Sequence, residues 1–193
     1  MNMKVSKTTR DLLSKRKLAR ADIGCGNNKQ GEDWFGIDRR KFDCVDLVQN
    51  LEKFPWAIPS KSFDVAVASH VVEHIQKADG IMLSFFNEVW RILKVGGEFL
   101  ISAPYATSPG FYRDPTHVSP INEELFCYLD PNDQFYQGGL YHIYSPLPFK
   151  IKVNTWHVTG NLEVVLVKRE ILKEYNVDKE YLKILSKNTK LTK

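Results

Sequence analysis

The strongest constraint on the fold is a strand, helix and strand pattern over residues 62–104. The segment SFDVAVAS (62–69) is apolar and typical of a buried parallel strand. Residues 79–94, DGIMLSFFNEVWRILK, carry apolar side chains at helical spacing, and we expect Asp79 to cap this helix and Gly96-Gly97 to end it. GEFLISAP (97–104) follows as an apolar strand. This βαβ order predicts an α/β protein with a Rossmann-like, mostly parallel sheet.

Further elements are predicted on both sides of this unit. A short helix is expected over residues 8–17, and strands are expected in LARADIG (18–24), WFGID (34–38) and DCVDLVQNL (43–51). FKIKVNTWHV and NLEVVLVKRE, joined through Thr159-Gly160, predict a C-terminal antiparallel β-hairpin. We expect one domain over residues 1–193: a core (18–104), a proline- and aromatic-rich insertion (105–148), the closing hairpin (149–170) and a charged tail (171–193).

Composition excludes several classes of protein. Apolar residues make up 43% and charged residues 26% of the chain, which is ordinary for a soluble globular protein. No stretch approaches the roughly 18 apolar residues of a membrane helix, and the basic N-terminus lacks the apolar region of a signal peptide. Three widely spaced cysteines (Cys25, Cys44 and Cys127) favour reduced thiols and a cytoplasmic location. Without a CxxC pair, no structural zinc site is expected.

The basic side chains are concentrated at the two ends. Residues 1–20 carry seven basic and one acidic side chain, and residues 168–193 carry eight basic and four acidic ones, although the net charge is only +4. Such ends suit arms that bind nucleic acid or an anionic surface. Solubilising, partly frayed termini are the alternative, which the lack of aromatic residues among the N-terminal basic residues favours.

The stretch ADIGCGNN (21–28) points to a ligand site. Gly24 and Gly26 follow the first predicted strand, where open α/β sheets bind ligands and where glycine lets a ligand approach the backbone. Asp38 ends the second strand, at the position of a carboxylate that accepts hydrogen bonds from ribose hydroxyls. Lys29 replaces the third glycine of GxGxxG, and any helix before Asp38 must be short. A ligand with a ribose but no phosphate therefore fits better than a dinucleotide or ATP.

Taken in order, ADIGCGNN, GID, VQNLEKFPWAIPSKSFDVAVASHVVEHI and FFNEVWRILKVGGEFLISAPY resemble class I S-adenosylmethionine-dependent methyltransferases. The resemblance is closest to the compact, type-11-like group with a GCG loop and a short first helix, and it spans residues 20–105. It implies S-adenosylmethionine as cofactor. It also implies a cofactor-binding set, which is Asp22, Gly24, Cys25, Gly26, Asp38, Asn50, Leu51, Ser69 and His70.

The resemblance implies a different role in cofactor binding for each of these residues. Gly24 and Gly26 leave room for the aminocarboxypropyl arm of the cofactor, and Asp22 binds its ammonium group directly or through water. Asp38 binds the ribose. Asn50 stands where the family usually has an acid near adenine, and its amide oxygen can still accept a hydrogen bond from the adenine amino group. The alternative is a plain tight turn with Asp22 as a structural cap.

The catalytic candidates are His117, Asp114 and His70. Methyl transfer is an in-line displacement, so an enzyme mainly positions the reactants, and a base helps when the acceptor is a hydroxyl. His117 is the first choice for that base, because it and Asp114 flank a proline turn after the fifth strand. The alternative is that both residues cap a helix beginning near Ser119-Pro120.

Other polar residues near these positions are predicted to have supporting roles. Arg113 and Tyr105 are candidate substrate-binding residues. His74 is expected on the same helical face as His70, and to orient the loop together with Glu73. Because HxxxH lacks a clear third ligand here, no metal is predicted.

The function expected from these features is O-methylation of a small molecule or sugar. The Asn/Asp-Pro-Pro-Tyr motif of amino-methylating enzymes is absent after the fourth strand, where ASHVV stands. Residues 105–148 are expected to form a wall or lid over the acceptor pocket. A nucleic-acid methyltransferase with basic arms is one alternative, and a non-catalytic module that binds the cofactor or a partner is another.

Overall fold

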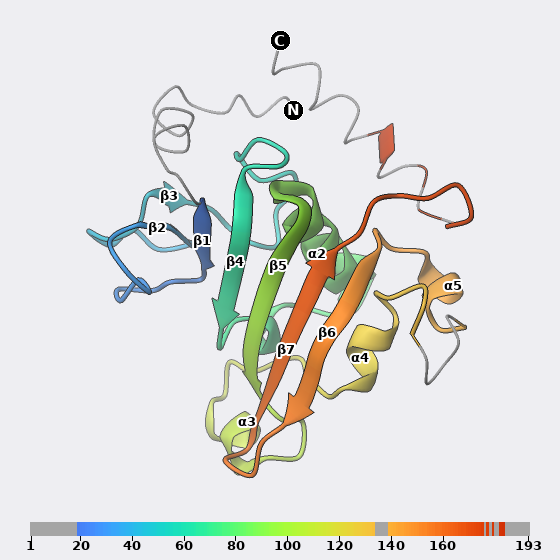
Figure 1. Ribbon diagram of the computed structural model, residues 1–193. Helices are drawn as coiled ribbons and strands as arrows, with labels where there is room; N and C mark the ends of the chain where they lie inside the picture. Colours follow the sequence, from blue (N-terminus) through green and yellow to red (C-terminus); the bar gives the residue numbers. More distant parts are fainter. Residues whose placement is uncertain (1–18, 134–138, 176, 178, 180–181, 184–193) are drawn as a thin grey trace.

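The computed structural model describes residues 19–133, 139–175, 177, 179 and 182–183 (Figure 1). The helix predicted over residues 8–17, most of the basic N-terminal arm and most of the charged tail lie outside this range. Among the described helices, none has the length and apolar character needed to cross a membrane.

Seven strands form one sheet, in the order β3-β2-β1-β4-β5-β7-β6. β1 to β5 pair in parallel, and β7 lies antiparallel between β5 and β6. The α/β class with a closing antiparallel hairpin is therefore confirmed. The strands are β1 (Arg20–Ile23), β2 (Trp34–Asp38), β3 (Leu47–Val48), β4 (Phe63–Ser69), β5 (Leu93–Pro104), β6 (Phe149–Trp156) and β7 (Asn161–Lys168).

The helices differ in detail from the predictions. The helix expected over residues 79–94 is α2 (Ile81–Ile92), and it follows a 3-10 turn, η2 (Ala78–Gly80). Asp79 does not cap it, because Asp79 adopts a φ of 53° inside η2 and Gly80 occupies the N-cap position. Leu93 is already extended and pairs with Phe63, so α2 ends there and Gly96-Gly97 lie inside β5.

Residues 27–33 form turns and bends, which agrees with the expectation that any helix before Asp38 must be short. Two further predictions of local structure are wrong. Of the strand predicted over residues 43–51, only Leu47–Val48 pairs with β2. No helix begins near Ser119-Pro120; among the described residues of the insertion, the short helices are α3 (Pro109–Arg113), α4 (Glu124–Cys127) and α5 (Tyr141–Tyr144).

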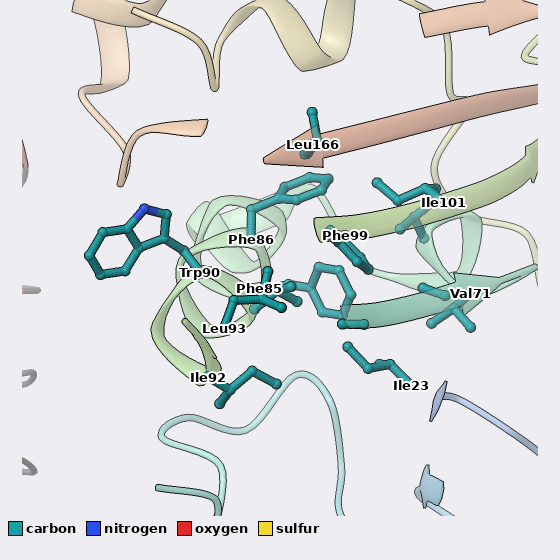
Figure 2. Packing of buried hydrophobic residues seen from close by; sticks show 14 of the residues in the cluster. Ile23, Val71, Phe85, Phe86, Trp90, Ile92, Leu93, Phe99, Ile101 and Leu166 are labelled. Carbon is teal, nitrogen blue, oxygen red and sulfur yellow. The ribbon is translucent and has the colours of Figure 1, made fainter. Parts of the chain in front are cut away.

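The core forms where α2 packs on the sheet. Figure 2 shows Phe85 and Phe86 of α2 pointing toward Phe99 of β5, and the ring centroids of both lie 6.3–6.4 Å from that of Phe99. These three side chains are essentially inaccessible to solvent. Aromatic side chains bury large apolar areas, so this contact fixes α2 against β5.

The first part of the insertion packs at the carboxyl-end edge of the sheet. β4 and β5 end at the lower edge in Figure 1, where α3 and the following loop lie. Glu73 belongs to the 3-10 turn η1 (Val72–His74) that follows β4, and its carbonyl accepts hydrogen bonds from the backbone N–H groups of Val118 and Ser119. The Ser119 hydroxyl also donates to the Ile75 carbonyl, at 2.5 Å. These bonds hold the insertion against the loop after β4.

Candidate functional site

A cavity of about 650 Å³ lies at the carboxyl ends of the parallel strands β1, β2 and β4. This volume falls within the usual range of small-molecule sites. The wall is made by segments from five regions of the chain: Gly24, Gly26, Asn27, Asp38, Arg39, Arg40, Phe42, Asn50, Leu51, Glu52, His70, Val71, His74, Ile75, Gln76, Asp114, Thr116 and Val118.

The two glycines of the loop after β1 have different roles. Both have positive φ angles, 73° at Gly24 and 56° at Gly26, which side chains of L-residues rarely adopt. A Cβ added at Gly24 would lie 2.5 Å from Cγ2 of Val71, whereas a Cβ at Gly26 would meet no atom within 4 Å. Gly24 lines the cavity, and its lack of a side chain is required by packing against Val71. Gly26 is the glycine whose missing side chain leaves open space.

Asp38 joins the glycine loop to the end of β2. Its Oδ2 accepts a hydrogen bond from the Gly26 N–H at 2.9 Å, and its Oδ1 accepts one from the Arg40 N–H at 2.7 Å. The side chain lies on the cavity wall with only 9% of its surface exposed. A carboxylate oxygen accepts more than one hydrogen bond, so both oxygens keep capacity for a ligand.

Asp22 and Cys25 do not line the cavity. Oδ2 of Asp22 accepts a hydrogen bond from the Gln30 N–H at 2.8 Å, so its carboxylate closes the loop that the glycines begin. Burial raises the pKa of Asp22 above its ordinary value. Burial, reinforced by the neighbouring Asp22, also raises the pKa of the Cys25 thiol to about 12.

Asn50 and Leu51 form part of the wall beyond Asp38. The Oδ1 atom of Asn50 accepts a hydrogen bond from the Glu52 N–H at 2.9 Å, which fixes the amide beside the cavity. Gln49, which the sequence analysis missed, is buried and donates to the carbonyls of Asn50 and Lys53, at 2.8 and 3.2 Å. This buried amide holds the turn that carries Asn50 and Leu51.

His70 is the predicted catalytic imidazole that reaches the cavity wall. It has a φ of 55° and its side chain is 52% exposed. Its Nδ1 lies 3.2 Å from Oε1 of Glu73, and the adjacent carboxylate raises the pKa of His70. The positive φ and the following 3-10 turn mean that His70 and His74 do not share a helical face, contrary to the expectation from their spacing.

His117 and Asp114 lie together beside this wall. Nδ1 of His117 donates to the Phe111 carbonyl at 2.7 Å, and its Nε2 lies 3.9 Å from both Oδ2 of Asp114 and Oε1 of Glu73. Asp114 lines the cavity, but His117 does not, and its side chain is only 8% exposed. Hydrogen bonds from the hydroxyl and N–H of Thr116 lower the pKa of Asp114.

The other predicted site residues lie outside the cavity wall. Ser69 is exposed at the end of β4, and Arg113 is exposed at the end of α3. Tyr105 packs against Trp156, with ring centroids 5.9 Å apart, and a hydrogen bond to Glu123 raises its pKa. The insertion thus contributes residues 114, 116 and 118 to the wall, not Tyr105.

Several wall residues were not predicted from the sequence. Arg39 and Arg40 also line the cavity. They directly follow Asp38, the predicted ribose-binding residue, so their position in the sequence could have indicated this. Phe42 adds an aromatic face, and Glu52 and Gln76 add polar atoms; the Gln76 N–H donates to Oε1 of Glu52 at 2.8 Å. Nothing local in the sequence marks Phe42 or Gln76, because loop conformation brings them to the cavity.

The sequence of the cavity-forming region matches a known family. Residues 21–101 match the family described as a methyltransferase domain. The chain is 35% identical over 91 residues to a protein of Mycolicibacterium smegmatis named a probable S-adenosylmethionine-dependent methyltransferase. That match covers 44% of this chain and 32% of the relative, so the chain spans about a third of that protein.

Solved structures share the fold at low sequence identity. A variant of the 16S rRNA (adenine(1408)-N(1))-methyltransferase of Catenulisporales acidiphilia, with its cosubstrate, has a TM-score of 0.56 at 13% identity, covering 86% of this chain and 91% of the other. The 1,6-didemethyltoxoflavin-N1-methyltransferase of Burkholderia thailandensis has a TM-score of 0.53 at 14% identity, covering 85% and 79%. The family match is consistent with the strand order of the sheet and with a ligand cavity beside the glycine loop. Residues 21–101 thus match a methyltransferase domain family, and the fold is shared with solved methyltransferase structures.

Proposed function

We propose that the protein transfers a methyl group from S-adenosylmethionine to an oxygen of a small molecule or sugar. The observation that carries this proposal is the cavity at the carboxyl ends of β1, β2 and β4. It is lined jointly by Gly26, by Asp38 and by the Asn50–Leu51 turn. Open α/β sheets bind ligands at this edge, and residues 21–101 match a methyltransferase domain family.

The residues present fit this cofactor. The open space at Gly26 is room that any side chain would fill, and it suits the methionine part. Asp38, held by two backbone N–H groups, offers free lone pairs to the ribose hydroxyls. Asn50 and Leu51 line the region beyond Asp38, where the adenine would lie against a polar edge and an apolar side chain. When bound, S-adenosylmethionine supplies an electrophilic methyl group on a sulfonium.

His70 is the group that we propose as proton acceptor for a hydroxyl substrate. Its Nδ1 faces the buried Glu73 carboxylate, so Nε2 is the ring nitrogen left to take a proton. A base that is oriented by a second group recurs among activated hydroxyl nucleophiles. The acceptor oxygen forms its bond to the methyl carbon as the carbon–sulfur bond breaks, and its proton passes to His70. His117, the first choice from the sequence, becomes a supporting residue, because it does not line the cavity.

The proposal of a small-molecule acceptor is supported by the size of the cavity and by the residues of its wall. Asp114, Thr116 and Val118 close the side beyond His70 and His74, which limits the space for an acceptor. A nucleic-acid acceptor is the second candidate, and the rRNA enzyme with the same fold supports it, but the basic arms lie mostly outside the described residues. The three free cysteines support a cytoplasmic location, where thiols stay reduced.

Transfer of a labelled methyl group tests the proposal. The full chain is incubated with labelled S-adenosylmethionine and a panel of hydroxylated small molecules, sugars and RNA, and S-adenosylhomocysteine release is measured. We expect turnover with a small hydroxylated acceptor, and a fall of about 100-fold or more in kcat for His70→Ala with cofactor affinity kept. Turnover on RNA alone would favour the second candidate. Cofactor binding without turnover on any acceptor would favour the non-catalytic module.

A further inference from the structure

A buried carboxylate without a donor lies beside the cavity. Glu73 is fully buried, and neither of its carboxylate oxygens accepts a hydrogen bond from any described residue. The nearest titratable nitrogen is Nδ1 of the half-exposed His70, 3.2 Å from Oε1 of Glu73. A buried charge is costly unless it is paired or coordinates a metal. A metal ion near Glu73 would therefore stabilise its buried carboxylate.

Two imidazoles complete a ligand set around this carboxylate. The ligand atoms of Glu73, His74 and His117 all lie within 4.8 Å of one another. Zinc binds imidazole nitrogen and carboxylate oxygen at about 2.0–2.2 Å, so shifts of about 1 Å would bring the three groups to one ion. Two histidines and one glutamate form a usual ligand set for a catalytic zinc with one open position.

The outer partners of both imidazoles suit metal ligands. Nδ1 of His117 donates to the Phe111 carbonyl at 2.7 Å, which leaves Nε2 directed at Glu73 and Asp114. The other histidine, His74, has its Nδ1 3.2 Å from the Thr116 carbonyl. Metal-binding histidines commonly use their second nitrogen in this way, because the bond fixes the ring and its tautomer.

We propose that Glu73, His74 and His117 bind a divalent transition-metal ion at the edge of the cavity. Imidazole ligands favour zinc and its neighbours in the first transition row over magnesium, which prefers oxygen ligands. No metal was expected from the sequence, because the His70/His74 pair has no clear third ligand nearby in the chain. The third ligand is His117, which the bonds from Val118 and Ser119 to the Glu73 carbonyl bring close.

The position of this site indicates its use, a point that rests on the proposed function. His74, Asp114 and Thr116 all line the cavity, so the open coordination position would face it. An acceptor hydroxyl bound to the metal would lose its proton more easily, as metal-bound water does. The metal would also hold the acceptor oxygen in place.

Cobalt binding tests the site without any assay of turnover. The full chain, treated with a chelator and then freed of it, is titrated with Co²⁺, and visible absorption bands report coordination by nitrogen ligands. We expect one Co²⁺ per chain, displaced by Zn²⁺ but not by a large excess of Mg²⁺. His117→Ala should weaken binding about 100-fold or more, since even outer partners of metal ligands contribute 10- to 100-fold.

Matched controls separate the site from general histidine binding and from loss of fold. His157→Ala removes an exposed histidine and should keep full binding. Glu73→Gln keeps the shape of the side chain, and Zn²⁺ should raise the melting temperature of the wild type but not of this variant. Equal binding by His117→Ala and the wild type, or no saturable site in the wild type, would overturn the proposal. Binding of S-adenosylhomocysteine, measured in parallel, keeps the two proposals distinguishable: each can fail while the other stands.

Discussion

The carboxylate of Asp38 accepts a hydrogen bond from the backbone N–H of Gly26, at 2.9 Å across the mouth of the cavity. One residue thus holds the glycine loop in place and offers its remaining lone pairs to a ligand. We expect Asp38→Ala to weaken S-adenosylhomocysteine binding by roughly 1.5–3 kcal/mol, because charge-assisted hydrogen bonds are lost. Calorimetry measures the dissociation constant, and Asp43→Ala, which removes an exposed carboxylate outside the cavity wall, is the control. An unchanged dissociation constant in Asp38→Ala would place the ribose elsewhere.

The open space at Gly26 gives a sharper test than Gly24. Gly26→Ala places a methyl group where no atom lies within 4 Å, whereas any side chain at Gly24 collides with Val71 and threatens the fold. We expect Gly26→Ala to weaken cofactor binding roughly tenfold or more, since an extra methyl group in a filled site costs about 1–3 kcal/mol.

Gly96→Ala is the matched control for this substitution. Gly96 also has a positive φ, 77°, and open space around its Cβ position, but it does not line the cavity. Both variants should lose about 1–2 kcal/mol of unfolding free energy through backbone strain. Only Gly26→Ala should lose affinity, and an equal loss in both would show that strain alone explains it.

The buried pair of Glu88 and Arg91 fastens α2 to the loop before β4. Nε and Nη2 of Arg91 each lie 2.8 Å from a different oxygen of Glu88, and Nη1 donates to the Ile58 carbonyl at 2.7 Å. Arg91→Met should lower the unfolding free energy by about 3–5 kcal/mol, because the buried Glu88 carboxylate loses its cationic partner and keeps the hydrogen bond from the Trp56 N–H. Urea denaturation measures this loss.

An exposed pair provides the comparison for that loss. Lys94 and Asp64 lie 2.8 Å apart at the surface, and Lys94→Met should cost less than about 1 kcal/mol. The double variant Glu88→Leu/Arg91→Met should recover part of the loss of Arg91→Met, because no charge is then left unpaired. A loss for Arg91→Met as small as that for Lys94→Met would contradict the account.

Lys168 gives the protein a stability that depends on pH. Its Nζ is buried, donates to the Leu93 carbonyl at 2.7 Å and lies 3.6 Å from the Trp90 ring centroid. Burial lowers its pKa from 10.5 to about 7, so between these values the unfolded chain binds more protons than the folded one. The contribution of Lys168 to the unfolding free energy therefore rises with pH above 7, by at most about 1.4 kcal/mol per pH unit.

Unfolding of Lys168→Met across this pH range measures that contribution. The variant should lose this rise in stability between pH 7 and 10, while Lys152→Met, at an exposed lysine, should keep it. The same slope in Lys168→Met and the wild type would show that the buried amine stays charged in the folded protein.

The parts of the fold that follow from local pattern were predictable. The apolar period of residues 81–92 and the apolar run of Phe63–Ser69 each define one element, and their order implies a parallel sheet. The turns between β1 and β2 were not predictable, because tertiary hydrogen bonds hold them: Asp22 accepts from the Gln30 N–H and Asp38 accepts from the Gly26 N–H.

The candidate site likewise has a part that was predictable from the sequence and a part that was not. Gly26 and Asp38 follow directly from strand ends, so sequence order alone placed them at one edge of the sheet. The approach of His117 to Glu73 depends on backbone bonds between segments some 44 residues apart, and no local pattern reports it. For the same reason, the contact of Gly24 with Val71 could not be foreseen.

Calorimetric titration of the full chain with S-adenosylhomocysteine tests the central claim most directly. The account predicts saturable binding of one ligand per chain, weakened by Asp38→Ala and by Gly26→Ala and kept by Gly96→Ala. It also predicts that the ligand raises the melting temperature, because a ligand that binds only the folded state stabilises it. No heat of binding at millimolar ligand, together with an unchanged melting temperature, would contradict the assignment of this cavity to the cofactor.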